Sequence, residues 1–263
     1  MKTSIALRLV ALGYLALLIA LPVALIVWRT FAQGLAPVWS TITQPDAVHA
    51  FWLTVLIVAI TVPVNTLFGV LCALVLVRHR FPGKAILNAV LDLPVAISPV
   101  VVGLALFIVY GREGWIGPWL LAHGMRVIFA VPGMILATIF ISLPFVVREV
   151  VPVLREIGTE QEQMAQALGA SPLQIFWRVT LPAIRAGVTY GVVLTTARAL
   201  GEFGAVSIVS GRLAGQTETL TLYVQERFEQ FDLTGAYTAS LLLALLALAT
   251  VVAMNLFKGR RAL

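Results

Sequence analysis

Six long runs of apolar residues constrain the fold of this chain more than any other feature of its sequence. They cover approximately residues 9–31, 52–77, 86–110, 128–147, 185–208 and 236–257. A helix rises 1.5 Å per residue, so roughly 20 apolar residues cross a bilayer core of about 30 Å. None of the runs alternates polar and apolar residues as the strands of a membrane barrel do. The sequence therefore predicts an all-α integral membrane protein with about six transmembrane helices.

The composition argues against an ordinary soluble protein. Apolar residues make up 60% of the 263 residues and charged residues 11%, whereas soluble chains have roughly 45–50% and about 25%. The net charge of +6 comes without a dense basic cluster, so we expect membrane lipid and no nucleic acid as a partner. No internal repeat and no appended soluble domain is visible. Residues 1–263 are predicted to form a single transmembrane domain.

No residue pattern predicts catalysis, metal binding or nucleotide binding. Cys72 is the single cysteine, which argues against a disulfide framework or a multi-cysteine metal site. His49, His79 and His123 lack ligand spacing such as H-x-x-x-H. The phosphate-binding pattern G-x-x-x-x-G-K-[ST] does not occur. We expect no catalytic residue, no metal and no cofactor on this chain, and we do not expect it to be an enzyme.

The first apolar run follows Lys2 and Arg8, as the core of a cleaved signal peptide would. Its stretch from Leu9 to Trp28 is longer than the roughly 7–15 residues of a signal peptide, and no small-x-small cleavage site ends it. We therefore expect a first transmembrane helix.

The distribution of lysine and arginine predicts the orientation. If both termini share one side, that side holds 12 Lys and Arg (2, 8, 78, 80, 84, 148, 155, 178, 185, 258, 260, 261) and the other side 5 (29, 112, 126, 212, 227). Because cytoplasmic loops carry the excess of positive charge, both termini are predicted to lie in the cytoplasm of a bacterial inner membrane.

The third run has two unusual features. Pro94 and Pro99 in one span predict an irregular helix, because each proline removes a backbone donor. Asp92 is expected at the cytoplasmic end of this run, near Lys84, with a structural role.

A polar segment, residues 160–182, interrupts the apolar pattern on the predicted cytoplasmic side. Residues 161–168 are helix formers, and Gly169 is placed to end that helix. Ser171 followed by Pro172 predicts the start of a second short helix, which Leu181-Pro182 is expected to end. Two short helices with a hinge could dock a soluble partner and pass force to the membrane, or could lie at the lipid interface.

Arg198 and Glu202 lie four residues apart within the fifth run, where they can form an ion pair. A lone charge at mid-membrane costs roughly 2.5–3.5 kcal/mol, which pairing lowers. Gly201 and Gly204 would let another helix, or the backbone of a partner subunit, come close. Two interpretations stay open: a structural pair, or an arginine that faces a polar pathway and receives a passing oxyanion.

Residues 207–224 and the polar stretch after them are predicted to form an external loop with some helix. The loop either contacts a substrate-binding protein or is ordinary solvated surface.

The polar segment resembles the cytoplasmic motif of ATP-binding-cassette importer permeases, E-A-A, three residues, G, then I-x-L-P after a gap. Ala165, Gly169, Leu181 and Pro182 match this motif. Gln163, Met164 and Val179 depart from it, and Glu162 lies one place early.

The stretch A-R-A-L-G-E-F-G-A-V-S-I-V-S-G-R-L-A-G, residues 197–215, resembles the oxyanion-import permeases of the sulfate and thiosulfate (CysW) type. Residues 91–104 and 176–182 fit the same subfamily, and the likeness extends over about residues 51–257. Molybdate and tungstate permeases share G-E-F-G and are the nearest alternative. A secondary anion carrier is a further one, but such chains usually show inverted repeats, and none is visible here.

The resemblance implies a transporter of several subunits. These would be this chain, a second related permease, an ATPase dimer and an extracytoplasmic sulfate-binding protein. ATP and magnesium would be bound by the ATPase. Contact with the ATPase would fall to Glu162, Ala165, Gly169, Leu181 and Pro182.

Overall fold

The computed structural model describes residues 7, 10 and 12–259, with side chains up to residue 252, and every regular element in this part is helical. In chain order the elements are η1 (Ala16–Ala20), α2 (Leu21–Phe31), α3 (Leu35–Ile42), α4 (Pro45–Arg78), α5 (Lys84–Ala96), α6 (Pro99–Tyr110), α7 (Gly117–Ala122), α8 (Val131–Ile157), α9 (Glu160–Ala167), α10 (Pro172–Ile175), η2 (Phe176–Thr180), α11 (Leu181–Leu200), α12 (Gly204–Val209), α13 (Leu220–Glu229) and α14 (Leu233–Gly259). The all-α fold class is confirmed.

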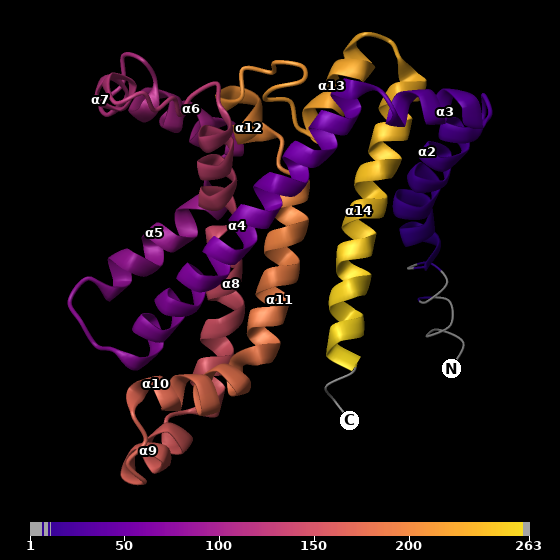
Figure 1. Cartoon of the computed structure of the whole chain (residues 1–263). Coiled ribbons are helices and arrows are strands. Elements are labelled where there is room, and N and C mark those ends of the chain that lie inside the picture. Colours follow the sequence, from indigo (N-terminus) through magenta and orange to yellow (C-terminus); the bar gives the residue numbers. More distant parts are fainter. Residues whose placement is uncertain (1–6, 8–9, 11, 260–263) are drawn as a thin grey trace.

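Four described helices are long and apolar enough to cross a membrane: Leu12–Phe31, Pro45–Arg78, Val131–Ile157 and Leu233–Val252. The pair of α5 and α6 would make a fifth if its two halves form one span. The remaining predicted run, 185–208, covers most of α11 and continues past its end into α12. α11 is 20 residues long and lies along the bundle beside α8 (Figure 1). Arg185 and Arg198 make α11 less apolar than the other four.

The predicted irregular helix is confirmed. The third run is divided into α5 and α6, and the chain bends by 113° between them. The break falls at Ile97 and Ser98, and Pro99 begins α6. At this first position of a helix the N–H has no partner within the helix, so a proline there costs no hydrogen bond.

The core of the bundle forms where α8 packs between α4 and α11. A Cβ on Gly69 of α4 would lie 2.6 Å from the Val146 Cβ, and a Cβ on Gly191 of α11 would lie 2.7 Å from the Val146 Cα. Glycine at both positions therefore lets the three backbones approach closely, as small residues do in membrane bundles. Asn65 of α4 joins this contact by donating to the Ser142 hydroxyl at 2.8 Å.

The two ends of the bundle carry different structures (Figure 1). α7, α12, α13 and α3 lie at one end, whereas α9 and α10 project from the other. α14 runs toward the end that carries α9 and α10.

Candidate coupling segment and buried charged pair

The polar segment folds as two helical pieces joined by a tight turn, as predicted. Gly169 has a φ of +85°, in the left-handed region that glycine adopts readily, and its N–H donates to the Gln166 carbonyl at 2.9 Å. Ser171 caps the second piece in a capping box: its hydroxyl accepts from the Gln174 N–H, and its own N–H donates to Gln174 Oε1 at 2.9 Å.

The predicted end of the second helix at Leu181-Pro182 is wrong. Helix continues from α10 through the π-helical turn η2 into α11. In this turn the Leu181 N–H donates to the Phe176 carbonyl, five residues back. A proline cannot donate to the preceding turn, and the wider turn accommodates it without ending the helix. Leu181 and Pro182 therefore join the polar segment to α11 as one continuous helix.

The polar segment exposes apolar side chains outside the bundle. The exposed fractions are 71% for Met164, 87% for Leu168, 68% for Leu173 and 59% for Trp177. Ala165 lies on the inner side and is half-buried. Apolar groups gathered on a segment that projects from the bundle are typical of a surface that a partner covers.

Glu162 points toward the bundle and contacts Arg78, the last residue of α4. The Arg78 Nε lies 3.0 Å from Glu162 Oε2, and the Thr180 hydroxyl donates to Glu162 Oε1 at 2.8 Å. The Gln163 side chain, at the motif's glutamate position, donates to the hydroxyl of Thr159, the residue before α9. Arg78 was absent from the predicted site. Its place at the predicted cytoplasmic end of the second run was the one signal for it.

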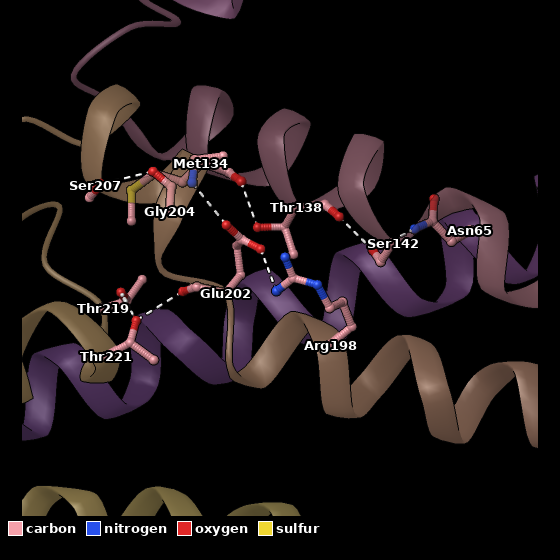
Figure 2. Close-up of polar contacts among 11 residues, drawn as sticks. Asn65, Met134, Thr138, Ser142, Arg198, Glu202, Gly204, Ser207, Thr219 and Thr221 are labelled. Atoms are coloured by element: carbon pink, nitrogen blue, oxygen red, sulfur yellow. Dashed lines mark hydrogen bonds and ion pairs between the residues drawn. The ribbon is translucent and has the colours of Figure 1, made fainter. Parts of the chain in front are cut away.

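Arg198 and Glu202 form the predicted ion pair, with Nη1 2.6 Å from Oε2. The Glu202 side chain is 1% exposed and the Arg198 side chain 28%. Glu202 Oε1 also accepts from the Ala205 N–H at 2.9 Å, so the carboxylate lies between Arg198 and the first turn of α12 (Figure 2). Thr221 of α13 donates to the Glu202 carbonyl at 2.9 Å. Glu202 therefore joins three elements.

The two glycines beside this pair differ. A Cβ on Gly204 would lie 2.8 Å from the Pro99 Cβ, which confirms the predicted close approach of another helix. Among the described residues, only the Ala197 carbonyl of its own helix lies within 4 Å of a Cβ built on Gly201, so no helix of this chain approaches it there. Approach by a partner subunit at Gly201 stays a prediction. Gly201 follows the last residue of α11.

The charge partner of Asp92 is Arg148, not Lys84. Arg148 of α8 donates to Asp92 Oδ1 through Nε at 3.1 Å and Nη2 at 2.8 Å. The two side chains are about half exposed.

The segment before α13 is packed more tightly than a solvated loop would be. Thr217, Glu218 and Thr219 are each at most 5% exposed. The Leu220 N–H donates to the Thr54 hydroxyl of α4 at 2.9 Å, and the Gln216 carbonyl lies 3.1 Å from His49 Nε2. The segment is therefore held on α4.

The pKa of Glu218 is raised to about 8, mainly by burial and in smaller part by the neighbouring Glu226 carboxyl, against an opposing effect of Arg227. The folded protein then binds more protons at Glu218 than the unfolded chain does, so we expect stability to fall as pH rises from 4.5 to about 8. Glu218→Gln, which resembles the protonated side chain, should remove this part of the slope. The melting temperatures of both proteins across this pH range measure this slope. An equal dependence of the two melting temperatures on pH would contradict the prediction.

A helical membrane bundle that carries a projecting polar segment with this motif defines a class of transporter membrane component. The chain belongs to the family of binding-protein-dependent transport system inner membrane components, whose model matches residues 65–261. Members are multi-pass inner-membrane components of transport systems, not enzymes.

Among relatives, the chain is 50% identical over 251 residues to the sulfate transport system permease protein CysW of Synechococcus elongatus, covering 95% of this chain and 88% of that protein. It is 45% identical to the CysW protein of Escherichia coli, covering 96% and 87%. Identity with the CysT permease of Escherichia coli is lower, at 38%, covering 95% and 90%.

Solved structures support the fold. A bacterial ABC transporter involved in the import of the acidic polysaccharide alginate matches with a TM-score of 0.82 at 18% identity, covering 99% of this chain and 96% of that one. The same kind of transporter in complex with an alginate-bound periplasmic protein matches with a TM-score of 0.80 at 18% identity, covering 98% and 94%.

Proposed function

We propose that this chain is the permease subunit of an ATP-driven importer that moves sulfate into the cytoplasm, with thiosulfate as a second substrate. The observation that carries the proposal is the identity of 45–50% over at least 95% of the chain with permeases named for sulfate transport. The relatives at lower identity that carry the CysT name are also sulfate permeases, which favours sulfate over molybdate.

The proposed assembly contains this chain, a related CysT-type permease, an ATPase dimer and an extracytoplasmic binding protein. ATP and magnesium belong to the ATPase subunits. Both termini and the polar segment face the cytoplasm, where the exposed Met164, Leu168, Leu173 and Trp177 meet the ATPase. The packed outer segment before α13 faces the binding protein.

Coupling requires that the nucleotide state of the ATPase and the access state of the membrane pathway bias one shared equilibrium. The continuous helix from α10 to α11 suits this role, because a shift of the polar segment is carried into the bundle without a loop between them.

Uptake of radiolabelled sulfate, in cells with and without this chain, tests the proposal. We expect deletion to abolish uptake, the chain to restore it, and unlabelled thiosulfate but not molybdate to compete. Intact sulfate uptake with loss of molybdate uptake would assign the chain to molybdate import instead.

A further inference from the structure

The helix α9 is joined to the rest of the chain by a glycine at each end. Gly158 precedes it with a φ of +64°, and Gly169 follows it with a φ of +85°. Apart from the two chain neighbours, no described residue has an atom within 4 Å of a Cβ built on either glycine. An open pocket of about 590 Å³ lies between part of this segment and the end of α4, bordered by Arg78, Glu162 and Phe176. Side-chain packing at these two glycines therefore does not fix the orientation of α9.

Three side chains hold α9 to the ends of the neighbouring helices: Arg78, Glu162 and Thr180. We name these three residues the Arg78 clamp. In addition to the 3.0 Å ion pair, Arg78 Nη2 donates to Glu162 Oε1 at 3.2 Å. The same guanidinium donates to the Leu154 carbonyl at 3.2 Å and to the Gly158 carbonyl at 2.6 Å, both at the end of α8. Thr180 adds its hydrogen bond from η2.

The clamp therefore links α9 to three membrane helices at once: α4 through Arg78, α8 through the carbonyls at its end, and α11 through Thr180. The Arg78 side chain is 13% exposed and that of Glu162 21%. Charged hydrogen bonds this far from solvent are stronger and more directional than surface ion pairs.

We propose that the Arg78 clamp transmits the movement of α9 to the membrane helices, with Arg78 and Glu162 as positioning residues. This inference rests on the proposed coupling to an ATPase. Without the clamp, α9 would rotate on its two glycines when the ATPase moves, and the bundle would not follow. Transport would then be uncoupled from ATP hydrolysis although the ATPase stays bound.

The test uses the complete transporter in proteoliposomes, with binding protein and sulfate, and compares Glu162→Gln, Arg78→Gln and the double variant. Two quantities are measured: ATPase bound per permease, and sulfate transported per ATP hydrolysed. We expect unchanged ATPase binding and a ratio that falls about tenfold, the scale of one lost charged hydrogen bond. The double variant should be no worse than the worse single one, because both remove the same interaction.

The matched controls are Glu160→Gln and Arg155→Gln, which neutralise exposed charges next to the clamp and should leave the ratio unchanged. A normal ratio in Glu162→Gln would overturn the proposal. So would loss of bound ATPase in this variant, because Glu162 would then be a docking residue. If Glu162→Gln fails to reach the membrane, Thr180→Val decides: a smaller fall in the ratio supports the clamp, and a normal ratio overturns it. If the proposed function is wrong, the unmodified assembly will not transport sulfate. That result is distinct from a clamp that does not work, for which the unmodified assembly transports sulfate.

Discussion

Glu202→Ala should be the most damaging single substitution in the bundle. It removes the charge partner of Arg198 and the acceptor of the Ala205 N–H together. Breaking a buried ion pair costs roughly 3–5 kcal/mol, and loss of a helix cap about 1 kcal/mol more. We expect the free energy of unfolding to fall by about 3 kcal/mol or more, because Arg198 keeps some contact with solvent. Thermal unfolding of the purified protein measures the change.

Glu202→Gln is the matched control, since its amide oxygen can still accept from Ala205 while the charge is lost. Its melting temperature should lie between those of the alanine variant and the natural protein. Equal melting temperatures for the natural protein and Glu202→Ala would show that the pair does not support the fold.

Arg198→Ala distinguishes the two interpretations of the pair. We infer a structural pair, because the guanidinium is already engaged by Glu202 at 2.6 Å. Sulfate uptake per permease molecule should then stay near normal while the protein becomes less stable. A stable Arg198→Ala protein without transport would instead make Arg198 a pathway residue.

Gly169→Pro should abolish sulfate uptake. Proline fixes φ near −65° and has no N–H, whereas this position has a φ of +85° and donates to Gln166. The turn between α9 and α10 cannot form, so the exposed apolar surface on both pieces is no longer presented as one unit. We expect the variant to reach the membrane without retaining the ATPase, as measured by co-purification.

Gly169→Asn is the control for this substitution. Asparagine tolerates the left-handed region and keeps the N–H, and the space around the position is open. It should retain most of the ATPase. Normal co-purification with Gly169→Pro would contradict the role of this segment in docking.

Local patterns predicted the features that depend on neighbours in sequence. The pairing of Arg198 with Glu202, the turn at Gly169 and the break before Pro99 all follow from spacing or from proline and glycine chemistry. The links from Arg78 to Glu162 and from Arg148 to Asp92 could not be predicted, because they join residues far apart in the chain. They depend on how the helices pack, as does the π-helical turn that carries helix past Pro182.

The contact of two glycines with Val146 has a mechanical consequence. At these two positions α4 and α11 present no side chain to Val146 of α8, so the packing there leaves little room to absorb a displacement of one helix. Arg78 and Thr54 lie near opposite ends of α4, about 36 Å apart at 1.5 Å per residue. A displacement of Arg78 would therefore tilt α4 as a rigid helix. The segment before α13, which is bound to Thr54, would move together with it.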